Sequence, residues 1–217
     1  MERSLAMNII TISREFGSGG RELGKRIADY LEYDYYDSEI ISAVAQSSGM
    51  NEGFVERALS NHGWREYPIT FRNTIASPMY VQSGMVNLLL EQKKVIEEIA
   101  AMGKNCVIVG RNADVILREY EPFKLFVCAD MAAKVKRCME RAPEDEHLSE
   151  KEMIRKIKQV DKNRAQTREL LTGSRWGQSS AYHLTVNTTD WEIKKLVYIT
   201  ARFAESWFYR KNENPAF

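Results

Sequence analysis

The chain has 217 residues, of which 44% are hydrophobic, and its 31 Lys and Arg nearly balance its 30 Asp and Glu. The resulting formal net charge of +1 gives no general reason to expect nucleic acid or a membrane surface as a partner, so any anion site has to be local. No apolar run has the length of a membrane span, and the first residues lack the order of a signal peptide. We therefore expect a cytoplasmic protein with one core.

Short β-branched runs alternate with longer helical patterns, which is typical of βαβ units around a parallel sheet. Five strands are predicted, the second being the weakest, at Asn8–Ile12, Asp34–Tyr36, Asn105–Val109, Lys124–Cys128 and His183–Asn187. Helices are predicted at Glu22–Leu31, Ser38–Ser47, Glu52–Ser60, Val81–Met102, Met131–Arg141, Ser149–Leu171 and Trp191–Tyr209. The pattern lapses between His62 and Pro78, where we expect an irregular connection. No linker appears, so residues 7–217 are predicted to form one domain after a leader or tag-like segment at residues 1–6.

A glycine-rich stretch joins the first strand to the first helix. It contains Gly17, Ser18, Gly19 and Gly20, and Arg21 follows them directly. Backbone N–H groups at the start of a helix are free to bind one anion, and glycine lets the chain turn tightly around it. This context favours a phosphate cradle, and the alternative is a flexible surface turn.

The stretch departs from the common P-loop pattern G-x-x-x-x-G-K-[ST]. If Gly19 takes the second glycine position, the first glycine becomes Arg14, the lysine becomes Gly20, and the hydroxyl directly after the lysine becomes Arg21. The cations that remain to bind phosphate are Arg14, Arg21 and Lys25. The hydroxyls that remain as Mg²⁺ ligands are Ser13 and Ser18.

The helix predicted at Ser149–Leu171 begins with a capping box formed by Ser149 and Glu152. Helical periodicity places two arginines, Arg164 and Arg168, on an otherwise apolar face made of Met153, Ile157, Val160 and Leu171. The opposite face is predicted to be solvated and consists of Lys151, Arg155, Lys158 and Lys162. A cation on the inner face is costly without an anion, which indicates a phosphate ligand at Arg164. An internal pair between Asp161 and Arg164 is the alternative.

The segment Ile10–Ala28, with "YYDSEII", "CVIVGRNAD", "DKNRA" and "YHLTVNTT", resembles the cytidylate kinase-like family. That family is similar to bacterial cytidylate kinases, which transfer the γ-phosphoryl group of ATP to CMP or dCMP. The resemblance implies an α/β fold of the P-loop class, a three-layer αβα sandwich with a parallel five-stranded sheet and a helical lid at about residues 142–173. It also implies ATP as donor, Mg²⁺ as cofactor and small-molecule nucleotides as ligands, without nucleic acid or membrane.

Site residues follow from the resemblance by position. Catalytic roles fall to Arg164, Arg111 and Arg21. Donor phosphates are expected at Arg14, Gly17–Arg21, Lys134 and Arg137, and the acceptor at Asp37, Ser38, Arg111, Asp161, Arg164 and Arg168. Arg111 is also well placed because it follows a strand end, where ligands of open parallel sheets collect, although a surface arginine is the alternative. An acceptor-phosphate arginine of cytidylate kinases falls at Ala43 here and a second lid arginine at Ile157, and helix capping alone would explain Asp37 and Ser38.

Two rival functions remain at this stage. One keeps the fold but phosphorylates another small molecule. The other is a nucleotide-binding sensor that lacks turnover, for which the absent lysine and hydroxyl are the reason. The helix at Val81–Met102 is apolar enough to be buried in the core or in a homodimer.

Overall fold

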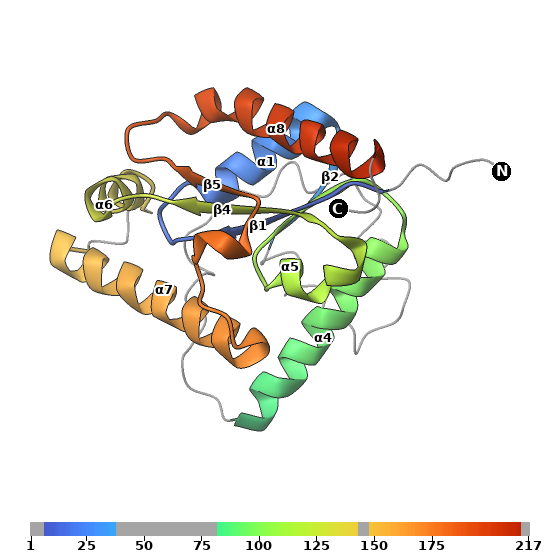
Figure 1. The fold of residues 1–217 in the computed structure, drawn as a ribbon. Coiled ribbons are helices and arrows are strands. Elements are labelled where there is room, and N and C mark those ends of the chain that lie inside the picture. Colours follow the sequence, from blue (N-terminus) through green and yellow to red (C-terminus); the bar gives the residue numbers. More distant parts are fainter. Residues whose placement is uncertain (1–6, 38–81, 143–147, 214–217) are drawn as a thin grey trace.

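Five parallel strands form the centre of the molecule, in the order β2-β3-β1-β4-β5. The structure, a computed structural model, describes residues 7–37, 82–142 and 148–213 (Figure 1). The strands are β1 (Ile9–Arg14), β2 (Asp34–Asp37), β3 (Cys106–Val109), β4 (Phe123–Cys128) and β5 (Leu184–Asn187). The five strands predicted from the sequence are therefore confirmed, with ends that shift by a residue or two.

Helices cover both faces of this sheet (Figure 1). On one face lie α1 (Gly20–Leu31) and α8 (Ile193–Glu213), and on the other lie α4 (Gln82–Ala101) and the short α5 (Ala113–Ile116). Beside them α6 (Met131–Glu140) packs on α7 (Glu150–Thr172). Two 3₁₀ turns complete the order, η3 (Arg118–Tyr120) and η4 (Ser179–Ala181). The predicted three-layer sandwich with a parallel sheet is confirmed.

The alternation of side chains along β1 explains the two cores. Ile10 and Ile12 point to the cluster under α1 and α8, whereas Ile9 points to the cluster under α4. Both faces of the strand are therefore apolar, as expected for a parallel strand covered by helices on each side. Glu15 follows β1 at the point where the chain leaves this core.

The predicted face of α7 is correct over its first half. The capping box of Ser149 and Glu152 forms, Met153 and Ile157 are buried, and the basic stripe of Lys151, Arg155, Lys158 and Lys162 is exposed. Leu171 is 48% exposed, so its predicted inward position is wrong. The apolar cluster with Phe16, Val135 and Cys138 supports only the first half of the helix.

Other elements lie beyond the reach of periodicity. The helix α5 and the 3₁₀ turns were not predicted, because segments of three or four residues carry no periodic signal. The helices predicted at Ser38–Ser47 and Glu52–Ser60, and the irregular connection from His62 to Pro78, lie outside the described residues.

Leu23 of α1 offers a direct test of the central packing. Its side chain is fully buried between helix and sheet, whereas Leu170 on α7 is 84% exposed. Leu23→Ala should lower the free energy of unfolding by about 2–5 kcal/mol, since it leaves a cavity in a close-packed core. Leu170→Ala, the same chemical change, should stay within about 0.5 kcal/mol in the same urea titration. Equal effects of the two substitutions would contradict the placement of α1.

Candidate functional site: a glycine loop beside three arginines

The loop between β1 and α1 approaches its neighbours closely because it contains glycine. Gly17 and Gly19 adopt φ angles of 78° and 81°, which side chains rarely tolerate. A Cβ atom on Gly17 would lie 2.9 Å from the Lys134 carbonyl oxygen, and one on Gly19 would overlap the Ile193 side chain. The loop is thus fixed between α6 and the start of α8, at the carboxyl end of the sheet.

Free backbone donors gather in this loop. Within the described part of the chain, no hydrogen bond uses the N–H groups of Gly17, Gly19 and Gly20. These unpaired amides lie at the start of α1, where the positive end of the helix dipole also lies. The arrangement has the chemistry of an anion cradle.

The neighbouring N–H group, that of Phe16, is bound by the lid helix α7. It donates to Asp161 Oδ1 at 2.7 Å. Lys134 Nζ lies 3.4 Å from the second oxygen of Asp161 and 3.1 Å from Glu15 Oε2, which also accepts from the Ala129 N–H at 3.2 Å. This carboxylate–ammonium network joins the loop to α6 and α7. The charge of Lys134, predicted as a phosphate ligand, is already balanced by two carboxylates.

Arg137, the second predicted ligand on α6, contacts backbone carbonyls instead. It donates to the Gly17 carbonyl at 3.4 Å and to the Thr188 carbonyl. Thr188 in turn donates from its hydroxyl to the Ser18 carbonyl at 2.7 Å. Sequence reasoning did not single out Thr188 or Glu15, because their roles depend on segments distant in the chain.

Three arginines from three elements converge beside the loop. Arg14 ends β1, Arg111 follows β3, and Arg164 lies on α7, from which it donates to the Arg14 carbonyl at 2.9 Å. Burial, together with the fields of Arg164 and Arg111, lowers the pKa of Arg14 to about 9, against the attraction of Asp37. Burial also lowers the pKa of Arg164 to about 10, against the opposing attraction of Asp161. These cations form a site of strong positive potential.

Arg164 also has internal contacts, as the alternative interpretation expected. It lies 3.5 Å from Asp161 Oδ1, and its guanidinium stands 5.8 Å from the centre of the Phe16 ring. Asp161 is shared with Lys134 and the Phe16 N–H, and the charge of Asp37 also attracts Arg14 and Arg111. Desolvation raises the pKa of Asp161, in spite of these partners.

A second charged pair lies at the end of β2. Arg21 Nε donates to Asp37 Oδ2 at 2.6 Å, and Asp37 is only 2% exposed. Desolvation lowers the pKa of Arg111, although the residue lies at the surface. The negative charge of Asp37 acts in the opposite direction and raises this pKa in part. The structure therefore brings the predicted acceptor residue Asp37 next to Arg21 and Arg111. Ser38 lies outside the described residues.

Arg168 lies apart from this cluster. Its Nη1 lies 2.8 and 2.6 Å from the two carboxylate oxygens of Asp114 on α5, with both side chains at most 5% exposed. Nε donates to Ser174 Oγ at 3.2 Å. This geometry favours a structural anchor for α7 over the predicted acceptor contact. The only sequence signal for Asp114 was its place in "CVIVGRNAD".

The two candidate Mg²⁺ hydroxyls are both buried. Ser18 Oγ donates to the Glu15 carbonyl at 2.8 Å, and the residue is fully buried, so its hydroxyl faces the loop backbone. Ser13 is 8% exposed near the end of β1. In the described part of the chain no group of three or more His, Cys, Asp or Glu side chains could hold a metal by itself.

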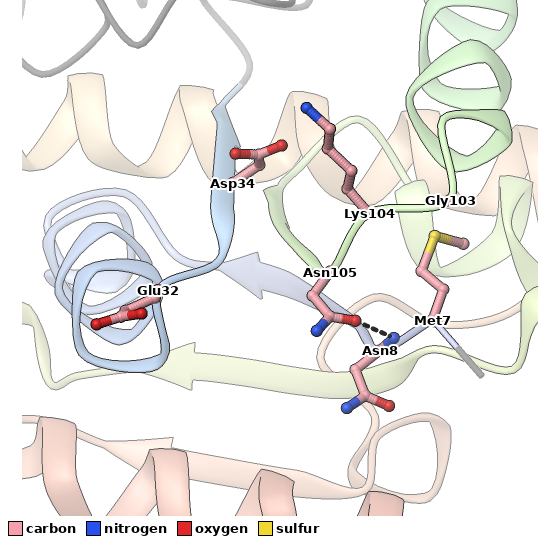
Figure 2. A pocket seen from close by; sticks show the side chains of 7 residues that line it. All are labelled: Met7, Asn8, Glu32, Asp34, Gly103, Lys104 and Asn105. Carbon is pink, nitrogen blue, oxygen red and sulfur yellow. Dashed lines mark hydrogen bonds between the residues drawn. The ribbon is translucent and has the colours of Figure 1, made fainter. Parts of the chain in front are cut away.

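A pocket of about 490 Å³ lies at the opposite, amino-terminal edge of the sheet (Figure 2). Figure 2 shows side chains of both charges around it, and the Asn8 N–H donates to Asn105 Oδ1 at 2.8 Å. The lining residues precede or follow strand starts and are Met7, Asn8, Glu32, Asp34, Gly103, Lys104 and Asn105. It is separate from the glycine loop.

Comparisons with known proteins concern the family and the fold of the chain. A model of the cytidylate kinase-like family matches residues 9–190. An uncharacterized protein from Eubacterium ventriosum is 24% identical, with a TM-score of 0.68 over 92% of this chain and 99% of that chain. Shikimate kinase from Bacteroides thetaiotaomicron is 15% identical, with a TM-score of 0.53 over the same shares of the two chains. No curated protein matches the chain significantly.

Replacing Arg168 tests the anchor. Arg168→Met should lower the free energy of unfolding by about 3–5 kcal/mol, because it leaves the Asp114 carboxylate buried without its partner. Adding Asp114→Leu should recover part of that loss, and urea denaturation measures both. An Arg168→Met protein as stable as the parent, with impaired turnover alone, would restore the predicted role as an acceptor ligand.

Proposed function

We propose, from the premise that this chain belongs to the cytidylate kinase-like family, that it transfers the γ-phosphoryl group of ATP to a nucleoside monophosphate, with CMP or dCMP as the expected acceptor. The observation that carries the proposal is the convergence of Arg14, Arg111 and Arg164 beside the free amides of the glycine loop. Transfer between two anions requires cations where the negative charge develops.

We assign one side of the site to each substrate. Donor phosphates would bind the amides of Gly17–Gly20, and the acceptor would bind near Asp37 and Arg111 at the ends of β2 and β3. Arg164 lies on α7 and donates to the Arg14 carbonyl beside the loop, so we expect it to contact the group in transfer. The phosphate of the acceptor is already an oxyanion, so positioning replaces a general base.

In this site Mg²⁺ would be coordinated mainly by nucleotide phosphates and only in part by protein oxygens. Mg²⁺ keeps several waters and is commonly held by substrate phosphates with one or two protein oxygens. Ser13 is the candidate hydroxyl that remains, since the Ser18 hydroxyl is bound to the Glu15 carbonyl. When bound, the ion would neutralise charge on the donor phosphates.

A second candidate acceptor is a small molecule other than a nucleotide. Ile157, at the position of a lid arginine in cytidylate kinases, is fully buried in the apolar cluster of α6 and α7, and Arg168 is paired with Asp114. Fewer cations therefore remain for an acceptor phosphate. Because the fold is similar to that of a shikimate kinase, we include a hydroxyl acceptor as the alternative to a nucleotide.

The cellular setting is also part of the proposal. None of the described helices combines the length and apolarity needed to cross a bilayer. A cytoplasmic location, nucleotides as the only partners and a possible homodimer through α4 remain predictions, as does the absence of a nucleic-acid partner.

Arg164→Ala is the sharpest test of the kinase site. Turnover should fall by about 10³-fold or more, the scale typical of arginines that stabilise phosphoryl transfer. Lys162→Ala, two residues earlier on the solvent face of α7, is the matched control and should leave kcat/KM unchanged. A similar small effect of both substitutions would refute the role of Arg164.

An acceptor screen with ADP detection separates the candidates. CMP and dCMP should give Mg²⁺-dependent ADP formation well above UMP, AMP and shikimate. Activity with shikimate alone would favour the second candidate. Binding of ATP by calorimetry without ADP formation from any acceptor would instead indicate a nucleotide sensor.

A further inference from the structure

Two of the three departures from the P-loop pattern lie against each other in space. Gly20 stands at the lysine position and Arg14 at the first glycine position. A Cβ atom on Gly20 would lie 2.6 Å from Cβ and 3.1 Å from Cγ of Arg14, and 3.1 Å from Cβ of Val127. Because these contacts involve Cβ and Cγ atoms close to the backbone, rotating the end of a side chain cannot relieve them. The stem of Arg14 therefore excludes a lysine at position 20.

The head of Arg14 extends from the glycine loop to the end of β3. A Cβ atom on Gly110 would overlap the Arg14 guanidinium, and Gly110 has a φ of 86°. Glycine at position 110 thus leaves the space that the guanidinium occupies. Arg14 spans from the first residue of α1 to the residue that precedes Arg111.

The other basic side chains near the loop are held elsewhere. Arg21 donates to Asp37 at 2.6 Å. Lys25 lies one turn further along α1 and pairs with Asp29 at 2.5 and 2.7 Å, on the outside of the helix. Lys134 is shared between Glu15 and Asp161. Of the candidates to replace the lysine, Arg14 alone lies against the residue at the lysine position itself.

We propose that Arg14 and Gly20 are a coordinated exchange, in which an arginine from the strand end takes the place of the P-loop lysine at the donor phosphates and Gly20 leaves the space for it. The inference rests on the proposed function, because it assumes a nucleoside triphosphate at the glycine loop. It makes Arg14 a catalytic residue and Gly20 a positioning residue.

The physical chemistry of the site is consistent with this exchange. A guanidinium binds phosphate oxygens through two parallel N–H donors, which an ammonium cannot do. Burial lowers the pKa of Arg14 to about 9, so the side chain stays protonated at neutral pH. Desolvated cations that repel one another gain most when a polyanion enters between them.

A double-variant cycle tests the exchange, because Arg14→Gly with Gly20→Lys restores the first glycine and the lysine of the ordinary P-loop pattern. The probes are MgATP and inorganic tripolyphosphate, and calorimetry measures their Kd. Arg14→Gly alone and Arg14→Gln alone should each weaken both by about 10- to 100-fold, the loss expected for a charged hydrogen bond. Gly20→Lys alone should also weaken both, because its side chain meets Arg14. The double variant should return to within about threefold of the parent.

Arg26→Gln is the control, since Arg26 lies on the solvent side of α1 and pairs with Glu22. It should leave both Kd values unchanged. Thermal melts of each variant separate lost binding from lost folding, and if Gly20→Lys does not fold, Arg14→Gln and the double variant still decide. Parent-like binding by Arg14→Gln, or a double variant no better than Arg14→Gly, would overturn the exchange.

The binding cycle needs no acceptor, so its outcome is independent of the acceptor screen. Coupling between positions 14 and 20 without phosphorylation of any nucleoside monophosphate would leave the exchange standing and remove the proposed activity. Phosphorylation of CMP in a protein without that coupling would do the reverse.

Discussion

The repulsion among Arg14, Arg111 and Arg164 is the constraint around which the carboxyl edge of the sheet is arranged. Each arginine comes from a different element, and burial together with the neighbouring cations lowers the pKa of Arg14 and of Arg164. A fold keeps such a cluster only where other interactions hold it or where an anion completes it. We propose the glycine loop as the anion site, whereas Asp161 and Asp37 supply carboxylates within the protein.

The contacts of Asp161 also connect the lid helix to the loop. Asp161 accepts from the Phe16 N–H and lies near both Lys134 and Arg164, so α7 cannot move without exchanging these contacts. Two turns further along the helix, Arg168 anchors α7 to α5 through Asp114. Under the proposed function the first set of contacts would compete with an entering phosphate, whereas the second, buried pair would hold the helix in place.

Sequence reasoning predicted most of the fold because the signals were local. The strands were visible as apolar runs, and the capping box located the start of α7. It failed for Leu171, since periodicity says which residues share a face but not how far the neighbouring core extends along it. It also predicted Lys134 and Arg168 as ligands beside the preferred Arg164. The carboxylates that pair with Lys134 and Arg168 come from distant segments, so their presence could not be read from spacing.

By itself the sequence determined the alternation of strands and helices, the place of the glycine loop between the first strand and helix, and the absence of the usual lysine. These depend on neighbouring residues and on period, which a chain carries before it folds. Only the tertiary structure decided which cation stands against Gly20, because the excluded volume around that position is created by the Arg14 side chain and by β4. Charge partners are chosen by distance in space, and that distance exists only after the sheet has brought its strand ends together.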